Sequence, residues 1–145
     1  MNTETRNCVS ACNKLLRGEI SAIETYQQAL EKFADSPHRA TIDQILDDHR
    51  KSADALRKHI ADMGGTADTE SGLWGQFAKA VEGTAKLMGD GPAIAALKQG
   101  EEHGISEYKE AINDPGVMAE AKVMYRDTLI PRLQKHIAVL EALPT

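Results

Sequence analysis

The chain has 145 residues and a formal net charge of −5, with 41% hydrophobic and 27% charged residues. Its length suits one domain with its own apolar core, and we expect a single domain over residues 1–145. The mild charge, without a run of five or six like charges, argues against nucleic acid as a partner. No apolar stretch approaches the roughly 18 residues of a membrane span, and the first ten residues are too polar for a signal peptide. We therefore expect no membrane association and a cytoplasmic location.

Cys8 and Cys12 are the only cysteines, and they lie four residues apart on a predicted helix. This is not the disulfide framework of a small secreted protein. Because small thiols readily fill helix interfaces, we interpret both as reduced side chains. A metal or redox role would need partners that the local sequence does not supply.

Helical periodicity dominates the chain and predicts an all-α fold. The first predicted helix runs from about residue 5 to 34 and stops before Pro37. The second continues to Gly64 and Gly65, which can adopt the left-handed conformations that end helices. The third helix begins after Pro92 and stops at NDPG (113–116).

The fourth predicted helix runs from about Met118 to the end of the chain, and Pro131 predicts a kink in it near His136. Residues 66–91 are too many for a tight turn, so they form a crossover. Within the crossover, Trp74 and its apolar neighbours have helical spacing and predict a short packed helix. Two hairpins joined by one long crossover make a four-helix bundle.

The sequence repeats itself between the two hairpins. GEISAIETYQQAL at 18–30 matches GEEHGISEYKEAI at 100–112, which pairs Glu19 with Glu101 and Tyr26 with Tyr108. RKHIA at 57–61 matches QKHIA at 134–138, which pairs His59 with His136. The repeat predicts matching faces in the two halves of the bundle.

Glu19 and Glu101 fall inside the apolar stripes of their helices, so both should point inward. A buried, unpaired carboxylate costs several kcal/mol, and a metal ion, histidines or arginines, or water must therefore satisfy them. His59 and His136 border apolar rows and are candidate partners. His49 also lies on an apolar stripe, but it is ten residues, roughly 15 Å, from His59 and cannot share an ion with it. We interpret His49 as a core histidine satisfied by its neighbours.

Through Glu19 and Tyr26, Glu101 and Tyr108, and a histidine on each returning helix, the chain resembles the ferritin-like superfamily of ferritins, bacterioferritins and rubrerythrins. It is also similar to a bacterial family of ferritin-like domains without an assigned function. ADMGG at 61–65, GLWGQFAK at 72–79 and ALKQGEEHGISEY at 96–108 carry this second resemblance.

The resemblance implies a carboxylate-bridged di-iron centre, in which each hairpin supplies a Glu from its first helix and a Glu-x-x-His from its second. Here Leu56 and Leu133 stand three residues before His59 and His136, so the bridging carboxylates are absent. The four ligands left suffice for one ion of iron or zinc. They are Glu19, His59, Glu101 and His136.

Other residues could complete or replace this site. Tyr26 and Tyr108 would donate hydrogen bonds that orient the two glutamates. Arg132 could instead neutralise a core glutamate, and Asp127 could act as an additional ligand.

Two functions follow from these residues. The first is a ferritin-like protein that binds iron or zinc in the bundle core. The second is a metal-free helical bundle that acts in stress physiology as a homo-oligomer, with a dimer expected. We assign no enzymatic activity, because the bridging carboxylates and the Cys-x-x-Cys module of rubrerythrins are missing. An iron store would require a cage of many subunits, and nothing in the sequence indicates such an assembly.

Overall fold

The computed structural model describes residues 1–71 and 90–144, and this part of the chain folds into helices joined by turns. The first hairpin consists of α1 (Thr3–Lys32) and α2 (Arg39–Asp62), and the second begins with α4 (Asp90–Asn113). Its returning arm is divided into α5 (Ala119–Met124), a π-helical turn η1 (Tyr125–Leu129) and α6 (Ile130–Ala142). The predicted all-α class and four-helix bundle are confirmed.

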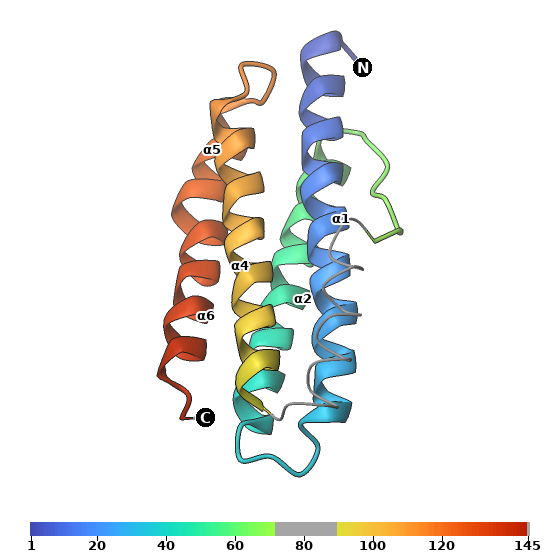
Figure 1. Cartoon of the computed structure of the whole chain (residues 1–145). Helices are drawn as coiled ribbons and strands as arrows, with labels where there is room; N and C mark the ends of the chain where they lie inside the picture. Colours follow the sequence, from blue (N-terminus) through green and yellow to red (C-terminus); the bar gives the residue numbers. More distant parts are fainter. Residues whose placement is uncertain (72–89, 145) are drawn as a thin grey trace.

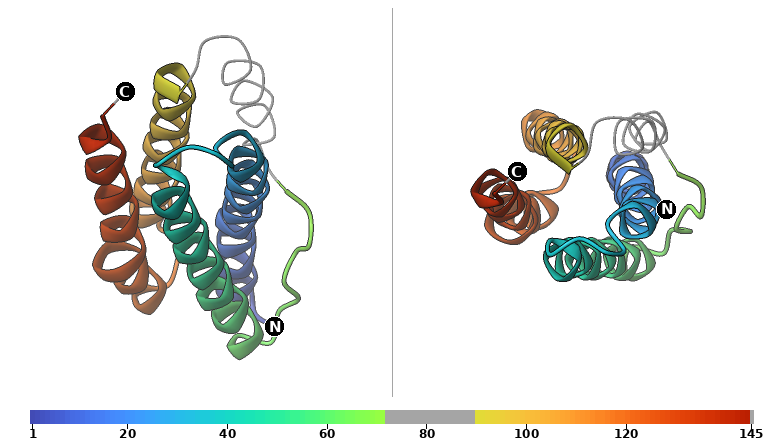
Figure 2. Two further views of the ribbon diagram at one scale, coloured as in Figure 1. Left: turned by 90° about the horizontal axis from the view of Figure 1, so that it is seen from below. Right: turned by 60° about the horizontal axis from the view of Figure 1, so that its bottom comes forward.

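The four long helical arms lie side by side, with the α1–α2 hairpin next to the α4–α6 hairpin (Figure 1). Viewed nearly along the bundle, the arms occupy the corners of a quadrilateral, in which α1 neighbours α2 and α4 (Figure 2). The chain leaves α2 at one end of the bundle and begins α4 at the other, so the connection is the expected crossover. The predicted short helix around Trp74 lies outside the described residues.

The first part of the crossover is fastened to α1. The side chain of Asn13 donates to the carbonyl of Thr66 over 3.0 Å and accepts from the backbone N–H of Asp68 over 2.8 Å. Arg17 also forms an ion pair with Asp68. These contacts keep the chain beside α1 as it returns along the bundle.

Local capping explains where the first hairpin begins and ends. The Asn2 side chain accepts a hydrogen bond from the Thr5 N–H at the start of α1, as expected for a helix N-cap. At the end of α2, Gly64 has a φ of 80°, and the N–H of Gly65 donates to the Ile60 carbonyl over 2.9 Å. This is the Schellman arrangement that a glycine after the last helical turn favours.

Pro131 is separated from η1 by Ile130 alone and lies in the first turn of α6. The N–H of Ile130 reaches back to the carbonyl of Tyr125, which widens the helix by one residue just before the proline. The sequence predicted a kink at Pro131, and the structure contains this widened turn in front of it.

Two apolar clusters form the core, and each takes residues from α1, α2 and α4. The first lies toward the N-terminal end of α1 and includes Cys8, Cys12, Leu16, Leu56, Ile60, Tyr125 and Leu133. The second lies toward the other end and includes Tyr26, Phe33, Ile42, Leu46, Leu97 and Leu140. In each helical arm, a buried acid or histidine lies between the residues of the two clusters.

The close contact between Gly65 and Val9 gives a test of this packing. A Cβ added at Gly65 would meet both γ-carbons of Val9 at 2.8 Å. We expect Gly65→Ala to lower the free energy of unfolding by about 1–3 kcal/mol through overpacking. When Val9→Ala is added to Gly65→Ala, chemical denaturation should show that most of the lost free energy of unfolding is recovered.

Gly64→Ala is the matched control, because a Cβ there meets nothing within 4 Å but the φ is positive. Its loss should come from backbone strain and should not change with Val9→Ala. If Val9→Ala restored the stability of both glycine variants equally, the close contact between Gly65 and Val9 would be contradicted.

Candidate functional site

A layer of four buried polar residues separates the two apolar clusters, and each helical arm supplies one of them. Glu19 comes from α1, His49 from α2, Glu101 from α4 and His136 from α6. None is more than 4% exposed. Each lies on the inward stripe of its helix, so helical periodicity alone brings them to the bundle axis.

His49 contacts both glutamates. Its Nδ1 lies 2.7 Å from Glu19 Oε2, and its Nε2 lies 2.8 Å from Glu101 Oε1. A neutral imidazole carries one N–H, so donating to both carboxylates requires the imidazolium. Burial would lower the pKa of His49, but the charges of Glu101 and Glu19 outweigh it and raise this pKa to about 10. His49 therefore carries a positive charge between two negative ones.

The two tyrosines of the repeat cross between the hairpins. Tyr26 on α1 donates its hydroxyl to Glu101 Oε1 over 2.7 Å, and Tyr108 on α4 donates to Glu19 Oε1 over 2.7 Å. Burial, together with the neighbouring glutamates, raises the pKa of both tyrosines, so both keep their protons. The tyrosine of α1 thus holds the glutamate of α4, and the tyrosine of α4 holds the glutamate of α1.

His136 is anchored on its outer side by Asp48. Its Nε2 lies 2.8 Å from Asp48 Oδ2, and its ring centroid is 5.0 Å from that of His49. Its Nδ1 is 3.2 Å from Glu101 Oε1, close enough for an ion pair, but it makes no hydrogen bond with any described residue.

Glu101 is the point where these contacts meet. Its Oε1 faces His49, His136 and Tyr26, whereas its buried Oε2 has no hydrogen-bond partner among the described residues. Burial would raise the pKa of Glu101, but His49 and His136 outweigh it and lower this pKa to about 2. The carboxylate is charged at neutral pH, and one of its oxygens remains available.

Three residues of this layer could hold a metal ion together. One ligand atom each from His49, Glu101 and His136 lies within 4.8 Å of the other two. In both histidines, the nitrogen on the far side from Glu101 is held by another carboxylate, Glu19 or Asp48. Such a carboxylate behind a histidine is how metal-ligating histidines are usually oriented.

A di-iron centre does not fit these residues, because the positions three before the histidines are Leu46 and Leu133. Both leucines are buried members of the apolar clusters and offer no bridging oxygen. One ion fits better, since two imidazole nitrogens and a carboxylate oxygen already converge.

The structure brings three of the four predicted ligands into this layer and leaves out the fourth. Glu19, Glu101 and His136 are in the layer, whereas His59 is grouped with Cys8 and Cys12. The helix α2 contributes His49 instead. Asp48, next to His49 in the sequence, was not among the predicted residues.

Counting from the turn between the first two helices could have identified His49. Glu19 lies 13 residues before the end of α1, roughly 20 Å from the turn at 1.5 Å per residue. His49 lies about 15 Å beyond the start of α2, and His59 about 30 Å. Only His49 is near the level of Glu19.

The two alternatives considered for the core, Arg132 and Asp127, have other contacts. Arg132 donates to the hydroxyl of Ser52 over 3.1 Å. Asp127 is exposed and pairs with Arg126 at 3.1 Å. Neither of these contacts involves a core glutamate.

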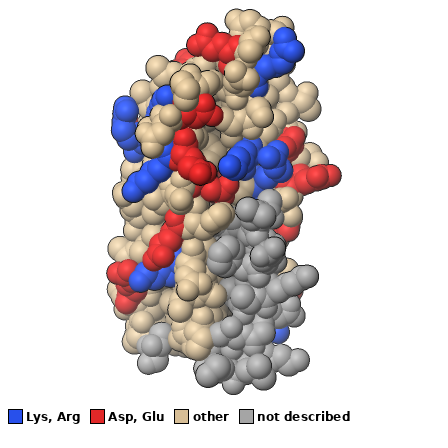
Figure 3. Space-filling model, turned by 45° about the horizontal axis from the view of Figure 1, so that its top comes forward, with Lys and Arg blue, Asp and Glu red and all other residues tan. Residues whose placement is uncertain are grey.

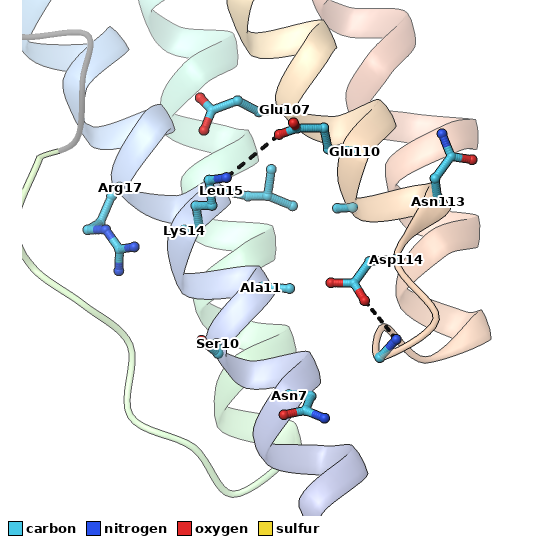
Figure 4. A pocket seen from close by; sticks show the side chains of 12 residues that line it. Asn7, Ser10, Ala11, Lys14, Leu15, Arg17, Glu107, Glu110, Asn113 and Asp114 are labelled. Carbon is cyan, nitrogen blue, oxygen red and sulfur yellow. Dashed lines mark hydrogen bonds and ion pairs between the residues drawn. The ribbon is translucent and has the colours of Figure 1, made fainter.

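A groove between α1 and α4 leads toward the polar layer. It has a volume of about 840 Å³, and Lys14 reaches across it to Glu110 at 3.7 Å (Figure 4). A smaller cavity of about 10 Å³, close to the size of one water molecule, touches Glu19 and His49. Leu15 and Glu107 line both spaces. The groove and the cavity beside the layer are therefore neighbours.

On the face drawn in Figure 3, acidic and basic side chains lie interspersed among uncharged ones. Among residues 1–71 and 90–144, no helix combines the length and the apolar character needed to cross a bilayer.

Comparisons with known proteins agree with the fold. A family model described as "Domain of unknown function (DUF2383)" matches residues 7–114. A crystal structure described as ferritin like, diiron-carboxylate proteins from Bacillus anthracis aligns with a TM-score of 0.69 and 21% identity. The alignment covers 97% of each chain. No curated protein matches. The ferritin-like resemblance is thereby confirmed for the fold.

The ionic contacts of His49 predict how stability depends on pH in chelator-treated protein. The pKa of His49 rises from 6.5 to about 10 on folding, so its contribution is complete below pH 6.5 and is lost as the pH rises toward 10. The pKa of Glu101 falls from 4.5 to about 2, so its contribution is complete above pH 4.5 and is lost toward pH 2. Stability from this pair is therefore greatest between pH 4.5 and 6.5.

Urea unfolding from pH 6 to 9.5 measures the alkaline limb. We expect the free energy of unfolding to fall more steeply with pH in the unsubstituted protein than in His49→Gln. His38→Gln, which replaces a buried histidine outside the layer, should keep the steep dependence. Equal slopes in all three proteins would contradict the charged state of His49.

Proposed function

The chain belongs to the family described as "Domain of unknown function (DUF2383)", and we propose from its core chemistry that it binds one divalent ion, iron(II) or zinc(II). The proposed ligands are His49, Glu101 and His136. Glu19 and Asp48 would hold the two histidines from behind, and Tyr26 and Tyr108 would hold the two glutamates.

The observation that carries this proposal is the pair of unused polar atoms at the centre of the layer. Glu101 Oε2 and His136 Nδ1 are buried and make no hydrogen bond within the described part of the chain. A core that only satisfied its own charges would be expected to pair such atoms, since buried polar groups nearly always have partners. An ion between the two histidines and Glu101 would give them one.

The types of ligand atom limit which metal ions would suit the site. Two imidazole nitrogens and one carboxylate oxygen suit zinc and ferrous iron, whereas calcium and magnesium prefer oxygen alone. The crystal structure to which the chain is similar is described as a diiron-carboxylate protein, which favours iron. When bound, iron would supply redox chemistry and zinc a Lewis acid.

Binding would displace a proton rather than rebuild the core. Without metal, His49 donates through both nitrogens to Glu19 and Glu101. To act as a ligand, His49 would release the proton on Nε2 and keep the Nδ1 proton that it donates to Glu19. Metal affinity should therefore increase with pH.

A second function is favoured by one observation. His49 already contacts both glutamates, so much of their charge is balanced without metal. The protein would then be a metal-free helical bundle, and its polar layer would serve the fold alone. A homo-oligomeric state, with a dimer expected, remains a prediction under either function.

Metal titration separates the two functions. We expect protein stripped of metal, with Cys8 and Cys12 replaced by alanine so that thiols cannot bind the ion, to take up one equivalent of Fe²⁺ under anaerobic conditions, measured by calorimetry and by elemental analysis after desalting. Glu101→Gln and His136→Gln should each lose this equivalent, because each removes a ligand.

Glu102→Gln is the matched control, because Glu102 is adjacent in sequence but its side chain is 54% exposed. It should bind Fe²⁺ as the protein without this change does. Folded protein that takes up no Fe²⁺, or binding that persists in Glu101→Gln, would contradict the first function; the former would support the second.

A further inference from the structure

We propose that Cys8, Cys12 and His59 form a second metal site, separate from the core layer, that binds one divalent thiophilic ion. The ion expected there is Zn²⁺. The two thiols come from α1 and the imidazole from α2. The proposal does not depend on metal binding at Glu101, because the two sites share no residue.

The geometry of the cluster supports this proposal. The two cysteines are four residues apart on α1, which puts them on one face of the helix, and both are fully buried. Each Sγ and a ring nitrogen of His59 lie within 4.8 Å of one another. His59 is ten residues, roughly 15 Å, along α2 from His49, so one ion cannot be shared with the core layer.

One ring nitrogen of His59 has no hydrogen-bond partner among the described residues. This atom, Nε2, is buried. A histidine that served only for packing would leave a polar atom unsatisfied, at a cost of about 1–3 kcal/mol. The residue as a whole is only partly buried.

Tyr125 holds the thiol of Cys12 through a hydrogen bond. Its hydroxyl lies 2.6 Å from Cys12 Sγ, and it is the first residue of the π-helical turn η1. Single π turns inside helices are frequent at functional sites. If Cys12 were a thiolate ligand, the Tyr125 O–H would donate a hydrogen bond to its sulfur.

Charge balance selects a divalent ion. Two thiolates and a neutral imidazole together carry two negative charges, which a divalent ion cancels within an apolar cluster. A monovalent ion such as Cu⁺ would leave one net charge buried there. Binding involves no change of oxidation state: each thiol releases its proton to solvent, and both sulfurs and the imidazole nitrogen donate electron pairs to the ion.

Cd²⁺ titration of reduced, metal-free protein tests the site, because thiolate ligation gives an ultraviolet charge-transfer band that nitrogen and oxygen ligands do not. We expect the band to saturate at one equivalent of Cd²⁺ and to be reversed by competing Zn²⁺. The double variant Cys8→Ala, Cys12→Ala should lose the band. His59→Gln should weaken Cd²⁺ binding by at least about tenfold.

Glu101→Gln is the matched control, because it disrupts the core layer and should leave the band unchanged. Circular dichroism confirms that each variant is folded, and His59→Gln, a change at a partly exposed position, provides a test if the double variant unfolds. Absence of the band, its persistence in the double variant, or unchanged affinity in His59→Gln would overturn the proposal.

Discussion

The contact of His49 with two buried glutamates is the interaction on which the rest of the core depends. Two carboxylates inside a bundle would each cost several kcal/mol without a partner. The imidazole reaches Glu19 and Glu101 from between them, and Tyr26 and Tyr108 each donate a further hydrogen bond to Glu101 and Glu19 respectively. These contacts join the two hairpins at mid-height, between the two apolar clusters. The layer therefore fixes which faces of the hairpins meet.

Under the proposed function, the same layer would let one core be stable without metal and still bind an ion. In the metal-free state a proton on His49 Nε2 lies against Glu101, and an ion would take the place of that proton. Glu19 and Asp48 would keep their hydrogen bonds to the outer nitrogens, so the histidines would not need to turn. Leu46 and Leu133 replace the carboxylates that a second ion would need, which limits the proposed site to one.

Much of this arrangement could be predicted from the sequence. The apolar periodicity and the glycine and proline breaks identified the helices and the crossover, and the repeat identified Glu19, Glu101 and their tyrosines as inward residues. His136 was also found. His59 was preferred to His49 because RKHIA repeats in QKHIA, but similarity of short motifs does not measure height along a helix. Asp48 was missed because it contacts α6, which lies far away in the sequence, and the cysteine cluster was missed because its third member comes from α2.

Under the proposed function, His49 would exchange a proton for a metal ion while it keeps its bond to Glu19. Nuclear magnetic resonance of ¹⁵N-labelled histidine rings, in metal-free protein at pH 7 and after one equivalent of Zn²⁺, tests this most directly. The Cys8→Ala, Cys12→Ala background removes competition from the thiols. We expect His49 to carry protons on both nitrogens before Zn²⁺ is added and on Nδ1 alone afterwards. A His49 ring that is neutral without metal, or that keeps both protons when Zn²⁺ is bound, would contradict it.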